Sequence, residues 1–159
     1  ADPQYAGELA EQIADEERHI DVFRRWLGDA AEPVRAPKPK QREQTVWFVT
    51  LLLNEVAGYC QFHMLAALLS EEAEAQDVLD VARDEEVHIE RLVRWLEPIA
   101  PTPAYKNTGV MVGRFEARLE GRMAQFLPGA ALGGLRREMA RITSELLHAV
   151  IPAFTGSPA

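Results

Sequence analysis

One stretch of this sequence occurs twice, and it decides the fold. DEERHI at residues 15–20, with RWL at 25–27, returns as DEEVHI at 84–89, with RWL at 94–96. Eight of the thirteen aligned positions are identical, and the two copies are 69 residues apart. Internal similarity of this kind reveals architecture. Because His, Trp and the DEE triplet all stay in register, the match is not a chance likeness between two charged helices.

Each copy of the repeat contains the pattern Glu-x-x-His. Glu16 and His19 form it in the first copy, and Glu85 and His88 form it in the second. Residues three apart lie on one face of an α-helix, so the two side chains of each pair can reach a common point. The spacing therefore predicts two matched carboxylate and imidazole pairs.

Three glutamates stand where the apolar pattern of a helix calls for a hydrophobic residue. Burying an unpaired carboxylate costs several kcal/mol, so such residues need a shared cationic partner. No lysine or arginine lies on the three stripes, and metal ions are the economical answer. The stripes are Leu9, Ile13, Glu16, Ile20, Phe23 and Leu27; Phe48, Leu52, Glu55, Tyr59, Phe62 and Leu69; and Val78, Ala82, Glu85, Ile89, Leu92 and Leu96.

Periodicity and punctuation predict an all-α protein of one domain, residues 1–159. No strand candidate is found. A polar, proline-rich segment at 28–44 is long for a link between packed neighbours and suits a crossover along a bundle. The predicted helices span about residues 4–27, 45–69, 71–96, 109–126 and 134–150.

Composition excludes several classes of function. A net charge of −8 argues against a nucleic-acid surface, which needs a basic face to neutralise phosphates. The apolar run at 46–53 is too short to span a bilayer, so no membrane partner is expected. The single cysteine, Cys60, cannot form an intrachain disulfide, which favours the cytoplasm.

The doubled motif resembles that of ferritin-like di-iron and di-manganese carboxylate proteins. That family uses a Glu from each of two helices and a Glu-x-x-His from each of two others, in a four-helix bundle. The 36 residues from His19 to Glu55 are similar to the interval in ferritins, bacterioferritins and rubrerythrins. The resemblance covers about residues 4–97. It implies that the metal ligands are Glu16, His19, Glu55, Glu85 and His88.

The chain departs from the family pattern at its start. Glu55 precedes Glu85 by 30 residues, and the same interval places the partner of Glu16 about 14 residues before Ala1. The first bundle helix is therefore expected upstream, or is replaced by the C-terminal helices or by another subunit. A third Glu-x-x-His, Glu145 and His148, lies at the margin of an apolar face and is interpreted as a solvated coincidence.

Three further residues are expected near the metals. In the resembling family, an Asp before the ligand Glu often accepts a hydrogen bond from the ligand His of the facing helix. That role would pair Asp15 with His88 and Asp84 with His19. Tyr59, one turn beyond Glu55, either bonds near the metals or lines the core, and packing is the preferred interpretation.

The resemblance implies a non-haem di-metal oxidoreductase with two iron ions, manganese being the alternative metal. Such a centre reacts with dioxygen or peroxide, as a ferroxidase, a peroxidase or an oxygenase. The two extra C-terminal helices could cover a substrate pocket, which favours an oxygenase on a small molecule. The rival hypothesis is a non-catalytic module with an incomplete metal site, used for dimerisation or binding. A homo-oligomer is expected, because a bundle that lacks one helix should expose an apolar strip.

Overall fold

The computed structural model describes residues 3–28, 43–99 and 108–150, and in these ranges all regular structure is helical. The chain divides into two compact units, the first unit at residues 1–41 and the second unit at residues 42–159. Within the described ranges, every helix is too short or too polar to cross a membrane.

The first unit contains one long helix, α1 (Pro3–Leu27), which confirms the helix predicted at about 4–27. Proline is well placed at a first helical position because its missing N–H has no intrahelical role there. Beyond the helix, Gly28 has φ 50°, the left-handed conformation with which many helices end. The predicted crossover at 28–44 lies almost entirely outside the described residues.

The apolar stripe predicted for α1 is not a buried face. Ile13 and Ile20 are 59% and 48% exposed, whereas Gln12 and His19 are each 5% exposed. Consecutive residues are about 100° apart around a helix, so the least exposed side is turned by that angle from the predicted stripe. The sequence pattern identified an apolar face correctly, but it could not tell whether another element covers that face.

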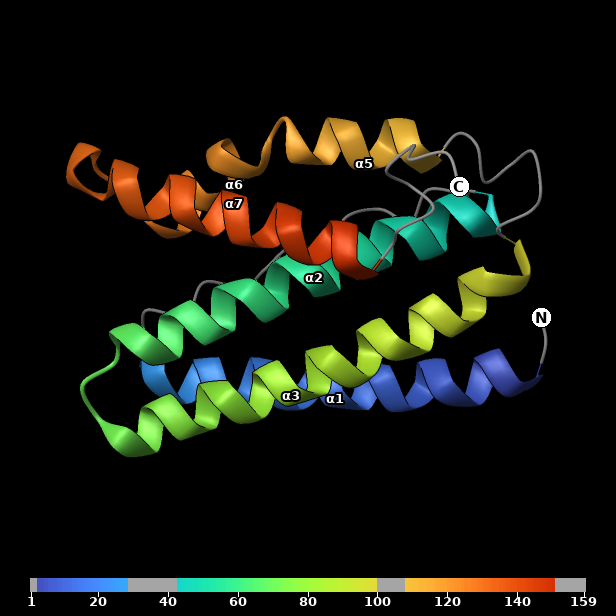
Figure 1. Cartoon of the computed structure of the whole chain (residues 1–159). Coiled ribbons are helices and arrows are strands. Elements are labelled where there is room, and N and C mark those ends of the chain that lie inside the picture. The colour runs from blue at the N-terminus through green and yellow to red at the C-terminus, as the bar shows by residue number, and fades with distance from the viewer. Residues whose placement is uncertain (1–2, 29–42, 100–107, 151–159) are drawn as a thin grey trace. The chain divides into compact units, whose positions relative to one another are not determined.

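The second unit is organised around α2 (Gln44–Leu68), which is followed by α3 (Glu72–Leu96) in an antiparallel hairpin (Figure 1). Both helices begin and end within one residue of the predicted bounds. The acidic residues Glu72 and Glu74 occupy the first turn of α3, where their negative charges stabilise the helix by interacting with the positive end of its dipole. A short 3₁₀ turn, η2 (Glu97–Ile99), continues from the end of α3.

The apolar stripe predicted for α3 is buried along its whole length. Its six members are between 0% and 7% exposed, and Glu85 is among them. At one end of the hairpin, the rings of Trp95 and Phe48 lie 5.2 Å apart and join α3 to α2. The hairpin therefore has a continuous hydrophobic core that contains a carboxylate. The six residues are Val78, Ala82, Glu85, Ile89, Leu92 and Leu96.

The helix predicted at 109–126 is in fact two helices, α5 (Thr108–Glu116) and α6 (Leu119–Phe126). The break is caused by a tightened last turn, in which the N–H of Arg118 bonds to the carbonyl of Phe115 at 2.9 Å. After a short 3₁₀ turn, η3 (Ala130–Leu132), the helix α7 (Gly133–Val150) confirms the one predicted at 134–150.

These C-terminal helices pack on the side of α2 opposite α3, so α2 is the central helix of the second unit (Figure 1). Glu116 of α5 accepts a hydrogen bond from Ser144 at 2.6 Å and lies 2.9 Å from Nε2 of His148, and these two contacts tie α5 to α7. Glu145 pairs instead with Arg141. The third Glu-x-x-His is thus part of a partly solvated network, as the sequence suggested.

Cys60 gives a direct test of the packing of α7 on α2. The residue is 4% exposed, and its burial raises the pKa of the thiol, although a hydrogen bond with Thr143 of α7 lowers it. A thiol reacts as the thiolate, so we expect alkylation of Cys60 at neutral pH to be slow and limited by unfolding. Mass spectrometry after iodoacetamide treatment, with and without urea, measures this rate. Labelling of the folded protein as fast as in urea would contradict the packing.

The same shift gives a pH dependence with a defined sign. A raised thiol pKa means that folded Cys60 holds its proton to higher pH than the unfolded chain does. Its contribution to stability is therefore complete below the unfolded pKa, about 8.5, and is lost as pH rises above that value. The Cys60→Ala variant should lose stability less steeply than the parent between neutral and alkaline pH.

Candidate metal centre

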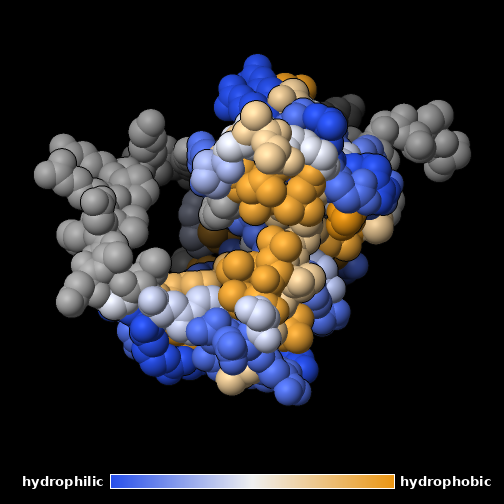
Figure 2. Space-filling view, turned by 90° about the vertical axis from the view of Figure 1, so that its left-hand side faces the viewer, coloured by the Kyte–Doolittle hydropathy of each residue, from blue (hydrophilic) through white to orange (hydrophobic). Residues whose placement is uncertain are grey.

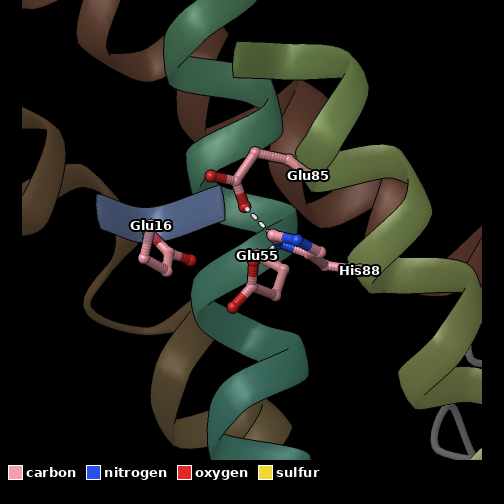
Figure 3. Close-up of side chains that lie close together, drawn as sticks. All are labelled: Glu16, Glu55, Glu85 and His88. Carbon is pink, nitrogen blue, oxygen red and sulfur yellow. Dashed lines mark hydrogen bonds and ion pairs between the residues drawn. The ribbon is translucent and has the colours of Figure 1, made fainter. Parts of the chain in front are cut away.

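The α2–α3 hairpin brings Glu55, Glu85 and His88 together in its interior. Glu55 and Glu85 are 6% and 5% exposed, and His88 is fully buried. Each residue offers a ligand atom that lies within 4.8 Å of the others. The three side chains point toward one another across the two helices (Figure 3). The second unit thus brings together three of the residues predicted as ligands.

The spacing of the three donors suits a metal ion. His88 Nδ1 lies 3.1 Å from Glu55 Oε2 and 4.0 Å from Glu85 Oε2. Ligand atoms about 2.0–2.2 Å from an ion, at the angles of tetrahedral or octahedral coordination, are about 3–4 Å apart. Two carboxylates and one imidazole at these distances could therefore bind the same ion with small side-chain adjustments.

The orientation of His88 identifies its ligand atom. Nδ1 faces both carboxylates, so Nδ1 would bind the ion, and Nε2 would be available to donate a hydrogen bond outward. Without an ion, the 3.1 Å approach is a hydrogen bond in which Nδ1–H donates to Glu55. Metal binding requires that Nδ1 lose this proton, and in the neutral imidazole the proton would then be on Nε2.

Gly58 makes room for the carboxylate of Glu85. A Cβ atom at position 58 would stand 3.3 Å from Cδ of Glu85 and 3.4 Å from its Oε2. The ring of Phe62 would lie 3.5 Å from the same point. The Glu85 carboxylate therefore rests almost directly on the backbone of α2. Sequence reasoning missed Gly58, although a glycine inside a helical pattern, three residues after Glu55, was a usable signal.

Replacing Gly58 with alanine should separate metal binding from stability. The new methyl group forces the Glu85 carboxylate to shift by a few tenths of an ångström, and we expect roughly tenfold weaker metal binding. Alanine has a helix propensity about 1 kcal/mol better than glycine, so the metal-free protein should be no less stable. Metal titration and urea unfolding measure the two effects.

A matched control is Gly121→Ala in α6, where a Cβ has open space. That variant should gain the same helix propensity and keep full metal affinity. If both alanine variants bound metal like the parent, Gly58 would have no role in positioning Glu85.

The other predicted pair, Glu16 and His19, lies in the first unit. His19 Nδ1 lies 3.5 Å from Glu16 Oε2, so the two side chains of this Glu-x-x-His do reach a common point. The Glu16 side chain is 46% exposed, and Glu16 is therefore not the buried carboxylate that the apolar stripe predicts. Glu16 is drawn with the three residues of the second unit in Figure 3. The argument from buried acids rests on Glu55 and Glu85.

The three supporting residues have different surroundings. Asp15 pairs with Arg18 of its own helix at 2.6 Å, and the bonds predicted for Asp15 with His88 and for Asp84 with His19 stay predictions. The ring of Tyr59 packs edge-on against His63, with centroids 4.5 Å apart. Burial and then the charge of Glu86 raise the pKa of Tyr59. These contacts agree with packing as its main role.

An apolar cavity of about 260 Å³ lies between α2 and the start of α7. Figure 2 faces the end of the second unit at which α2 passes into α3, and it shows hydrophobic residues gathered in its middle. Phe62 belongs both to this cavity and to the surroundings of the Glu85 carboxylate. Leu127 and Met139, from the C-terminal part of the chain, help to line this cavity. Its lining is Gln61, Phe62, Met64, Leu65, Leu68, Leu127 and Met139.

Comparison with known proteins found no family model, no curated protein and no solved structure that matches this chain. The described residues form a helical protein, and its second unit contains a group of carboxylates and a histidine that could hold a metal ion.

Proposed function

We propose that this protein is a non-haem di-metal carboxylate oxidoreductase of the ferritin-like type, with iron as its metal. The observation that carries the proposal is the convergence of Glu55, Glu85 and His88 inside the α2–α3 hairpin. Two buried carboxylates within a few ångströms repel each other, and a divalent cation between them offsets both the repulsion and the desolvation cost.

The internal repeat supports a second ion. Glu16 and His19 reproduce the spacing of Glu85 and His88 and also meet at one point of their helix. The family resemblance implies that Glu16 and His19 belong to the same set of ligands as Glu55, Glu85 and His88. The complete set is then three carboxylates and two imidazoles. Mixed oxygen and nitrogen donors of this kind suit Fe(II), and also Mn(II). Iron is preferred because of the family resemblance.

The protein's part in such chemistry follows from its own residues. Bound iron would supply the reaction with dioxygen or peroxide. The buried stripe of α3 keeps water from the carboxylates, and Gly58 fixes the position of Glu85. The apolar cavity beside Phe62 would admit a small apolar molecule. These features favour an oxygenase acting on a small molecule over a ferroxidase or a peroxidase.

Metal analysis tests this proposal. Protein loaded with Fe(II) without oxygen and then desalted should retain about two irons per chain, measured by plasma mass spectrometry. Admission of oxygen should then produce oxygen uptake in proportion to the iron bound, measured with an electrode. The proposal would be refuted if the protein retained no iron, and also retained no manganese after an equivalent loading with Mn(II).

A second candidate function is a non-catalytic module that binds one ion or none. The partly exposed Glu16, with Ile13 and Ile20 exposed beside it on α1, favours this alternative. In that case α1 would serve as a contact surface, and the protein should form dimers at micromolar concentration. At most one iron per chain, no oxygen uptake and a dimer in analytical ultracentrifugation would together support the module.

A further inference from the structure

Three arginines follow one another at intervals of four residues across the α5–α6 break. Arg114, Arg118 and Arg122 have this spacing, which places successive side chains on one side of helical backbone. Despite the break at Arg118, all three arginines line the same hollow. A row of three positive charges is unexpected in a chain whose net charge is −8.

The arginines surround a hollow of about 560 Å³ between these helices and α2. The hollow is apolar at its base, where Leu53 and Phe115 are 4% and 8% exposed. The remaining lining residues are Thr50, Met111 and the three arginines. A site with this distribution has a hydrophobic floor and a positively charged edge. The lining residues are Thr50, Leu53, Met111, Arg114, Phe115, Arg118 and Arg122.

Among the described residues, 3–28, 43–99 and 108–150, no carboxylate pairs with Arg114 or Arg118 at this edge. Glu116, the acid between them in sequence, is held by Ser144 and His148 of α7. The two guanidinium groups are thus available to an external anion.

The third arginine is fixed in place. The guanidinium of Arg122 lies over the ring of Phe115, 4.9 Å from its centroid, and donates a hydrogen bond to Asn54 Oδ1 at 3.3 Å. A guanidinium held by a cation–π contact and a hydrogen bond loses less freedom when it binds an anion. The hollow therefore offers one oriented arginine and two adaptable ones.

We propose that this hollow binds a small soluble anionic amphiphile, with a carboxylate or phosphate head on the arginines. The apolar part of the ligand would lie against Leu53, Met111 and Phe115. Arginine recognises both kinds of head group through paired N–H donors. This site is separate from the proposed metal centre, because Leu53 and Glu55 are two residues apart on α2 and point about 160° away from each other.

Calorimetric titration with decanoate tests the proposal. Decanoate and decyl phosphate should bind with a dissociation constant in the micromolar range, whereas decanol and inorganic phosphate should bind at least about tenfold more weakly. If decanol bound as tightly as decanoate, the arginines would not contribute to binding. If inorganic phosphate bound as tightly as decyl phosphate, the apolar base of the hollow would not contribute. Either result overturns the proposal.

Variants locate the site. R114Q/R118Q should lose about tenfold or more in decanoate affinity, because charge-assisted hydrogen bonds disappear. R137Q, which removes an exposed arginine of α7 outside the hollow, should bind like the parent. Equal affinities in both variants would overturn the proposal. Iron content should be unchanged in R114Q/R118Q, so failure of this site is distinguishable from failure of the metal centre.

Co-sedimentation with phosphatidylglycerol vesicles distinguishes a soluble ligand from the head group of a membrane lipid. The proposal expects decanoate binding without vesicle binding. Vesicle binding in the absence of decanoate binding would overturn the soluble ligand in favour of a lipid surface.

Discussion

Replacing Glu55 with alanine is expected to lower iron affinity by more than about 100-fold while the fold is retained. Residues that merely orient a metal ligand are worth about 10–100-fold in affinity, so loss of a ligand itself should cost more. The fold should survive because the substitution also removes a buried charge from the interior of the hairpin. Iron stoichiometry after desalting, together with circular dichroism, measures both results.

The matched control for Glu55→Ala is Glu86→Ala. Glu86 is the exposed neighbour of Glu85 on the outer side of α3, and its loss should leave iron binding unchanged. Unchanged iron content in Glu55→Ala would show that this carboxylate is not a ligand. Equal losses in both variants would indicate that net charge, rather than the cluster, governs binding.

Replacing Trp95 with alanine is expected to destabilise the second unit by about 3–5 kcal/mol. The side chain is 1% exposed and packs on Phe48, so its removal leaves a large cavity between α2 and α3. The midpoint of urea unfolding should fall sharply, and the unfolding slope should stay the same.

The internal repeat offers a comparison for this variant. Trp26 is the counterpart of Trp95 in the first copy, but it is half-buried and its ring contact, at 5.6 Å, is with Phe23 of the same helix. Trp26→Ala should therefore cost clearly less than Trp95→Ala. A larger loss of unfolding free energy in Trp26→Ala would contradict the half-buried position of Trp26.

The sequence was most informative for the hairpin of the second unit. The apolar stripe of α3 has a strict alternation of three and four residues, and the helix begins and ends within one residue of the predicted bounds. Glu85 could be placed inside because every neighbour on its stripe is apolar. Periodicity identifies a buried polar residue reliably when the whole face is buried, since the exception then stands out.

The parts that were missed depend on spatial relations rather than on pattern. The break at Arg118 follows from one tightened turn, and periodicity continues straight through it. The exposure of Ile13 and Ile20 reflects what covers α1, which a single helix does not reveal. The hollow between α2 and α5 joins residues about 60 positions apart, a relation that no periodic pattern in the sequence reveals.

For the candidate metal centre, the residue types and their spacing were sufficient to select Glu55, Glu85 and His88. Their distances, the direction of Nδ1 and the role of Gly58 required coordinates. The absence of a side chain at Gly58 becomes meaningful only once the Glu85 carboxylate is seen to occupy the space next to it.

Anomalous scattering at the iron edge, from crystals of the iron-loaded protein, tests the central claim most directly. An anomalous peak is expected about 2.0–2.2 Å from Glu55, Glu85 and Nδ1 of His88, and a second peak is expected beside Glu16 and His19. Peaks confined to exposed acidic residues, or Glu55 and Glu85 packed together with no peak between them, would contradict it.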